Sequence, residues 1–153
     1  MAHIFTDSGI SALLTVFPQT ASAQPTVLYV GLFASQTSGT VPSRTAQGGA
    51  VPASWVETPQ FASARQVISG NQWGAPAING NGVRVTGAQV TFPTATANGL
   101  SANGFFVATL VSSKAGDVPI AFANFDDLTM LTINSGDVVK VTPTMQLNIS
   151  ALS

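Results

Sequence analysis

The apolar positions near the start of the chain follow helical spacing. Within residues 6–17, four apolar side chains fall at i, i+3, i+4 and i+7: Ile10, Leu13, Leu14 and Phe17. Thr6 or Asp7 can cap the first turn, and Pro18 cannot continue a helix. The pattern predicts one short N-terminal helix over 6–17 whose apolar face packs on a core.

From Thr26 onward the pattern is typical of β-strands. Apolar, β-branched and aromatic runs alternate with short turn signals such as Asn79-Gly80-Asn81-Gly82 and Ser135-Gly136-Asp137. The predicted strands are 26–33, 61–68, 83–92 with a break at Gly87, 104–111, 119–124, 128–133, 137–142 and 145–150. Many short strands with regular turns predict a mainly β fold, an antiparallel β-sandwich or barrel, as a single domain over 1–153.

Residues 34–60 do not fit this pattern. The segment is rich in Ser, Thr, Gly, Pro and Ala, yet it contains Val41, Val51 and Trp55. Loops longer than about 12–15 residues in a compact domain are usually functional or disordered. We expect an extended arm that lies on a neighbouring molecule, with a flexible linker as the alternative. Trp55, Val41, Val51 and also Trp73 are therefore candidate interface residues, because aromatic side chains dominate interface energetics.

Composition excludes several classes of function. Only 7% of residues are charged, the net charge is −1, there is no cysteine, and the one histidine is His3. Five basic residues cannot form a patch that neutralises nucleic-acid phosphates, and disulfides, thiolate sites and multi-histidine metal sites lack their residues. We expect no catalytic residue, no cofactor, no metal and no nucleic-acid partner. With 45% hydrophobic residues, disorder is not expected either.

No apolar run approaches the ~18 residues of a membrane helix. The first residues carry no basic stretch before the apolar segment, so we expect neither a signal peptide nor a membrane partner. A chain with so little charge is expected to have low solubility as a free monomer. We therefore expect much of its surface to be buried in an assembly.

Oxygen ligands for a calcium ion could come from Asp126 and Asp127, with Asn124 and Asp137. Adjacent residues on a strand point to opposite faces, however, and no calcium-loop spacing is present. The sequence therefore does not favour a metal site here.

Arg65 lies in the middle of the predicted 61–68 strand. If it faces inward it needs a carboxylate or carbonyl partner, and Glu57, Asp126 or Asp127 could supply a carboxylate. The alternative is an arginine on an edge strand, solvated by water.

The order of motifs resembles that of small structural proteins of tailed-phage virions. A Thr26-Val27-Leu28-Tyr29-Val30-Gly31-Leu32-Phe33 strand is followed by Glu57, Ala64-Arg65-Gln66 and Trp73, then Thr91-Phe92-Pro93-Thr94-Ala95-Thr96, 131–137 and 141–149. The likeness spans nearly the whole chain. The chain departs from it at Phe61-Ala62-Ser63, where a glycine and a tyrosine are usual, and in its longer 34–60 loop.

The resemblance implies a virion component assembled in the host cytoplasm, best described as a capsid decoration or cement protein. Its partners would be the major capsid protein and further copies of itself, with a trimer suggested by analogy alone. The alternative is a tail-fibre, head-fibre or spike component that takes part in host attachment and partners a tail or fibre protein. A small glycan-binding or enzymatic β-domain would need clustered aromatic residues with paired carboxylates at a cleft, and the sequence does not place them. Phenylalanines could also anchor an interface, but we assign Phe92, Phe105, Phe106 and Phe122 to the core.

Overall fold

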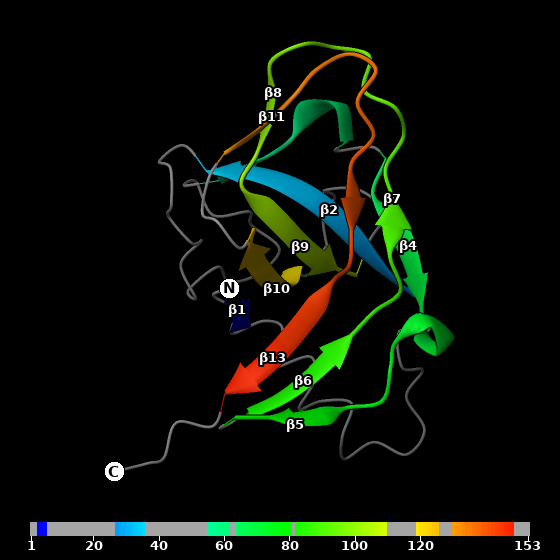
Figure 1. Ribbon diagram of the computed structural model, residues 1–153, viewed down its shortest axis with the longest axis vertical. Helices are drawn as coiled ribbons and strands as arrows, with labels where there is room; N and C mark the ends of the chain where they lie inside the picture. The colour runs from blue at the N-terminus through cyan, green and yellow to red at the C-terminus, as the bar shows by residue number, and fades with distance from the viewer. Residues whose placement is uncertain are drawn as a thin grey trace.

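The computed structural model describes residues 3–5, 27–35, 55–61, 64–80, 82–109, 119–125 and 130–148. This part of the chain is mainly β, built from antiparallel sheets, as predicted (Figure 1). Its helical segments are two single 3-10 turns, η1 (Pro59–Phe61) and η2 (Gly70–Gln72). The helix predicted over 6–17 lies outside the described residues.

A central antiparallel sheet organises the fold. Its strands follow the order β1-β10-β9-β2, and β3 and β4 both pair with the outer edge of β2. Their bounds are β1 (His3–Phe5), β2 (Val27–Ser35), β3 (Trp55–Glu57), β4 (Gln66–Ser69), β9 (Gly104–Ala108) and β10 (Pro119–Asn124).

β3 and β4 lie along the same edge of β2, and between them the chain leaves the sheet in an excursion over residues 58–65. Glu57 pairs with Phe33 and Gln66 pairs with Val30, so residues 58–65 leave and rejoin the sheet beside Gly31 and Leu32. The excursion contains η1, which places Phe61 in the core.

This arrangement corrects two predictions. Residues 61–68 are not one strand, because the segment begins in η1 and β4 starts only at Gln66. Residues 34–60 are not one loop either, since β2 continues to Ser35 and β3 begins at Trp55. Pairing with β2 satisfies backbone hydrogen bonds at both ends of that segment, which outweighs its loop-like composition. Residues 36–54, with Val41 and Val51, lie outside the described residues.

Three smaller sheets complete the described fold. They are β8 (Leu100–Ala102) with β11 (Leu131–Ile133), β7 (Val90–Thr91) with β12 (Lys140–Val141), and β5 (Ala77–Asn79) with β6 (Gly82–Thr86) and β13 (Thr144–Asn148). The three-stranded sheet occupies the lower end of the molecule in Figure 1.

The break predicted at Gly87 is confirmed. β6 ends at Thr86 and β7 begins at Val90, and between them Gly87 forms an isolated bridge with Trp73. Its N–H also donates to the Pro143 carbonyl at 2.8 Å. A Cβ at this position would displace the end of the Ile68 side chain and press on Pro143 and Trp73, so the close packing at this bend favours glycine.

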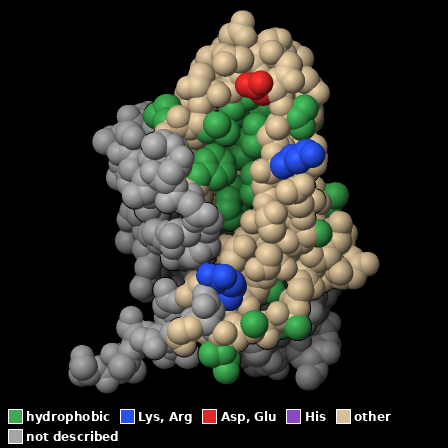
Figure 2. All heavy atoms as spheres, viewed as in Figure 1, with side chains coloured by type: hydrophobic (Ala, Val, Ile, Leu, Met, Phe, Trp, Pro, Cys, Tyr) green, Lys and Arg blue, Asp and Glu red, His purple; other side chains and the backbone are tan. Residues whose placement is uncertain are grey.

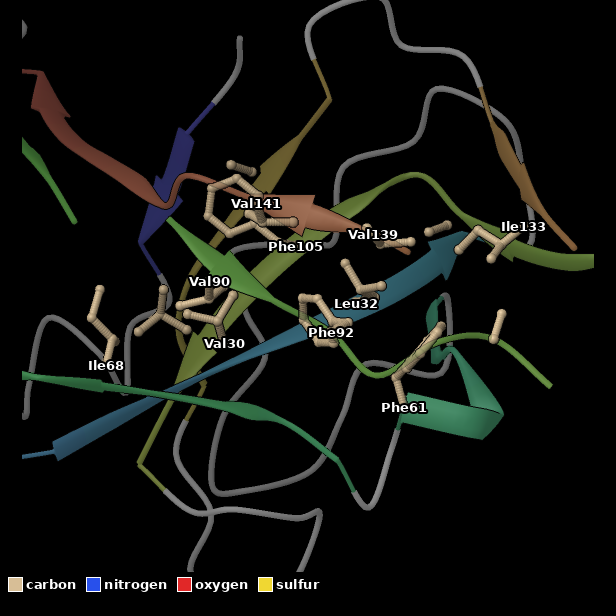
Figure 3. Close-up of a cluster of buried hydrophobic side chains, with 14 residues drawn as sticks. Val30, Leu32, Phe61, Ile68, Val90, Phe92, Phe105, Ile133, Val139 and Val141 are labelled. Carbon is tan, nitrogen blue, oxygen red and sulfur yellow. The ribbon is translucent and has the colours of Figure 1, made fainter. Parts of the chain in front are cut away.

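Both faces of the central sheet are buried. On one face, Val30 and Leu32 pack with Phe105 and with residues of β7 and β12 (Figure 3). In the same cluster the Phe61 and Phe92 rings meet edge to face, with centroids 5.5 Å apart. The opposite face carries a second cluster of Phe33, Phe106, Ala108 and Phe122. Burial on both faces explains why β2 and β9 are continuously apolar, and it confirms the core assignment of Phe92, Phe105, Phe106 and Phe122.

Candidate functional site

The described residues hold no group of three or more His, Cys, Asp or Glu side chains that could bind a metal ion. Asp137 instead closes a turn, since its Oδ2 accepts a hydrogen bond from the Asn134 backbone N–H at 2.8 Å. Asn124 is buried in β10, and Asp126 and Asp127 lie outside the described residues. None of the helices in the described part of the chain is long and apolar enough to cross a membrane.

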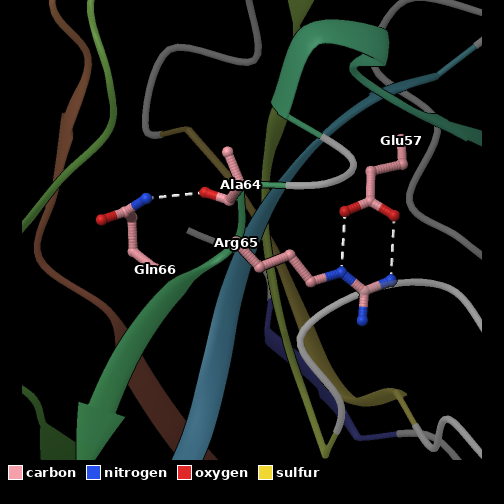
Figure 4. A network of polar contacts seen from close by, with 4 residues as sticks. All are labelled: Glu57, Ala64, Arg65 and Gln66. Carbon is pink, nitrogen blue, oxygen red and sulfur yellow. Dashed lines mark hydrogen bonds and ion pairs between the residues drawn. The ribbon is translucent and has the colours of Figure 1, made fainter.

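The most organised polar feature is a buried ion pair between Arg65 and Glu57 (Figure 4). Arg65 Nε donates to Glu57 Oε1 at 2.8 Å, and Arg65 Nη2 donates to Glu57 Oε2 at 2.9 Å. The side chains are 0% and 7% exposed. Of the arrangements that the sequence left open, the structure shows this inward-facing pair, with Glu57 as the carboxylate. Arg65 lies just before β4 rather than inside a strand.

Sheet register explains why these two residues meet. Glu57 ends β3 opposite Phe33, and Arg65 precedes β4 next to Gly31, so the excursion between them brings residues eight apart in sequence onto one sheet face. Thr58 fixes the start of the excursion, since its N–H donates to the Leu32 carbonyl at 3.0 Å and its Oγ1 to the Ser101 carbonyl at 2.8 Å. The ion pair therefore ties the two ends of the excursion together.

Phe106 and Gly31 complete the surroundings of the pair. The Arg65 guanidinium carbon lies 4.8 Å from the centroid of the Phe106 ring, a cation–π arrangement. A Cβ on Gly31 would overlap the Phe106 ring and lie 3.1 Å from Glu57 Oε1. The absence of a side chain at Gly31 thus makes room for the ring and the carboxylate.

Sequence reasoning found Glu57 and Arg65 but missed Phe106 and Gly31. The signal for Gly31 was present, because a glycine within an apolar strand often marks a close approach. Nothing in the sequence indicated that Phe106 is the residue opposite Gly31, which is a matter of register between β2 and β9. In this buried bidentate pair each charge has the other as its partner, so the pair connects the end of β3 to the start of β4.

The predicted interface residues have different positions in the fold. Trp55 begins β3 and pairs with Ser35 along the backbone, and its side chain lies outside the described part of the structure. Trp73 is half-buried and packs partly against the main core cluster. Trp73 therefore contributes to the protein's own core as well as to its surface.

The described surface carries little charge. Of the five charged residues in this part of the chain, Glu57 and Arg65 are buried together, which leaves Arg84, Asp137 and Lys140 exposed. Several large apolar side chains are exposed as well, and Figure 2 shows hydrophobic side chains in a hollow on one face and along the lower rim. The exposed set comprises Val67, Ile78, Val83, Met130, Leu131 and Val138.

Comparisons of the chain with protein-family models, with curated proteins and with solved structures each gave no match.

Proposed function

We propose that this chain is a structural component of a tailed-phage particle, and specifically a capsid decoration protein that binds capsid subunits and copies of itself. The observation that carries the proposal is the near absence of charge from the described surface, together with its exposed aliphatic side chains. Charged residues are depleted at the centres of protein interfaces, and a net charge near zero favours association. The resemblance of the motif order to phage virion proteins gives this assembly role its setting, the virion.

We infer further that the layered packing is a β-sandwich. The central sheet would be one layer, and the β7–β12 and β8–β11 pairs would be the other. Val90, Val141 and Ile133 of the small sheets belong to the same buried cluster as Val30 and Leu32 of the central sheet, which supports this interpretation. A rigid two-layer core suits a protein whose role is to present surfaces rather than to change shape.

Copy number tests the location on the particle. Densitometry of purified virions, calibrated with the purified chain, should give hundreds of copies per particle for a capsid decoration protein. A few to tens of copies would place the chain in the tail or a fibre and would refute the decoration role.

The register of β2 and β3 allows a clean test of the predicted arm. Deleting 38–54 joins Thr37 to Trp55. Because the Thr58 N–H donates to the Leu32 carbonyl, Ala34 and Val56 form the last hydrogen-bonded pair, and a four-residue hairpin loop remains between them. Changing Gln36 to Pro and Thr37 to Asp favours the type I turn around which such loops are usually built. The β-core should stay folded by circular dichroism.

Binding to capsids stripped of the protein should then fall, by about thirty-fold if an anchor worth about 2 kcal/mol is lost. Trp55→Ala in the full chain separates the side chain from the rest of the arm and should weaken binding in the same direction. Unchanged binding of the deletion variant would show that the segment is only a spacer.

A further inference from the structure

The three-stranded sheet at the lower end of the molecule has the strand order β13-β6-β5. Among the described strands, β5 (Ala77–Asn79) pairs with β6 alone, so its other side is an open edge. Ile78, at the centre of β5, has a side chain that is 87% exposed, the highest value among the large apolar residues described. Unpaired strand edges and exposed apolar side chains both favour association with another chain, and Ile78 combines the two.

The turn beside β5 determines which backbone groups face the open edge. Asn79 pairs with Gly82 across a two-residue loop in which Gly80 has a φ of 57°. The residues that close a two-residue loop form a hydrogen-bonded pair, and hydrogen-bonded pairs alternate with non-hydrogen-bonded pairs along antiparallel strands. Ile78 and Val83 are therefore a non-hydrogen-bonded pair, and the N–H and C=O of Ile78 point outward from the sheet.

The register also defines an apolar row on one face. Ile78 lies opposite Val83, and Val83 lies opposite Leu147 on β13. Val83 is 41% exposed. On the other face of the sheet, Arg84 Nε donates to Gln146 Oε1 at 3.4 Å, and Thr86 Oγ1 lies 3.5 Å from Thr144 Oγ1. The row thus runs to the open edge on a face distinct from the polar one, and Figure 2 shows hydrophobic side chains along this lower rim.

We propose that β5 pairs antiparallel with β5 of a second copy of this chain, about a two-fold axis at Ile78. The two three-stranded sheets then form one continuous sheet of six strands. The Ile78 N–H of each copy donates to the Ile78 carbonyl of the other. The apolar rows of the two copies meet, which covers the exposed isoleucine with its own counterpart.

The edge itself favours a second copy as the occupant. Pro76 has no N–H and the turn begins at Gly80, so Ile78 is the one residue of the edge that presents both a donor and an acceptor. An antiparallel pairing that uses both groups of Ile78 in each chain has a single register, Ile78 on Ile78. No charged residue lies on β5, and a net charge of −1 sets up little repulsion between copies. Natural edges usually carry charges that prevent such pairing.

The contact is small. Strands of three residues cover far less than the roughly 800 Å² per partner of a stable complex, so the pairing is weak between free molecules and grows in importance where many copies are held close together. It does not depend on the proposed function, because it can be measured with the purified full-length chain.

A single cysteine tests the geometry, since the natural chain has none. Hydrogen-bonded antiparallel partners have Cα atoms about 5.5 Å apart, which a disulfide can bridge. Ile78→Cys should therefore form a covalent dimer on a non-reducing gel after mild oxidation, several-fold faster than two controls. Val83→Cys lies on the next strand, so its two copies would be about 14 Å apart across the joined sheets. Val67→Cys, 51% exposed on β4, measures random collision.

A charged side chain at the proposed two-fold axis tests whether contact between the two Ile78 side chains stabilises the pairing. Ile78→Lys places like charges directly opposite each other, which opposes pairing. Sedimentation velocity over a concentration series should show that the natural chain associates more than Ile78→Lys, while Val67→Lys behaves as the natural chain does. Because Ile78 is exposed, the variant should keep its circular dichroism spectrum and melting temperature.

The outcomes are decisive in either direction. Selective cross-linking at position 78 supports the proposal even where free association is too weak to sediment. Cross-linking no faster than that of Val67→Cys overturns it. Weaker binding of Ile78→Lys to another virion protein, without selective cross-linking at 78, would also overturn it and would assign the edge to a different partner. A low copy number per virion would refute the decoration role and leave this pairing unaffected.

Discussion

Removal of Arg65 from its ion pair should be one of the most damaging single substitutions in the described fold. In Arg65→Met, an unbranched apolar chain replaces the stem of the arginine, and the two donors to Glu57 disappear. The Glu57 carboxyl group, whose side chain is 7% exposed, is then left buried without its partner. Breaking one side of a buried pair costs about 3–5 kcal/mol, and the lost contact with Phe106 adds to this. Since whole domains are stable by about 5–15 kcal/mol, the loss is a large share of the total.

A double-mutant cycle isolates the interaction itself. Glu57→Gln should also be costly, because it leaves the Arg65 charge buried without its counter-charge. The double variant Glu57→Leu with Arg65→Met removes both charges, and replacing a buried pair with apolar residues is often close to neutral. Its loss of stability should therefore be far smaller than the sum for Glu57→Leu and Arg65→Met alone, which gives a coupling energy of several kcal/mol.

Urea denaturation followed by tryptophan fluorescence measures these changes, and urea does not screen the ion pair as an ionic denaturant would. Arg84→Met is the matched control, since Arg84 is exposed on β6, and its effect should stay within about 0.5 kcal/mol. A cost below about 1 kcal/mol for Arg65→Met, the range of solvent-exposed pairs, would refute the reasoning. So would a double variant whose loss equals the sum of the single ones.

Two further substitutions test the packing around this pair and in the main core. Gly31→Ala should cost about 1–3 kcal/mol in urea unfolding, because the added methyl group overlaps the Phe106 ring and must displace it from Arg65; unchanged stability would mean that the ring has room to move. Phe61→Ala should cost about 3–5 kcal/mol, since Phe61 is fully buried against Phe92. Phe61→Leu should cost clearly less, and equal losses for the two variants would show that η1 does not depend on how the side chain fills the core.

Several elements of this fold were predictable from local pattern alone. The 119–124 strand was predicted with the bounds that the structure shows, and the 104–111 segment was predicted as a strand whose first five residues form β9. Side chains alternate every two residues along a strand, so a run that is apolar at every position fits only a strand covered on both faces. The turns at Gly80 and Gly136 were also predicted from the sequence, and both glycines have a positive φ in the structure. Glycine adopts a positive φ at little cost, which is why it marks such turns.

The sequence also determined that Arg65, if it faced inward, required a carboxylate or carbonyl partner, because a buried guanidinium without one is too costly. Which carboxylate it takes was decided by tertiary structure. Glu57, Asp126 and Asp127 were equally suitable by charge, and the choice depends on β3 and β4 sharing one edge of β2. That shared edge also determined that the 34–60 segment contains the end of β2 and all of β3, since backbone pairing with a distant strand does not depend on side-chain pattern. The exposed Ile78 has the same origin. A three-residue strand between turns has no periodicity to read, and only the order β13-β6-β5 places it at an open edge.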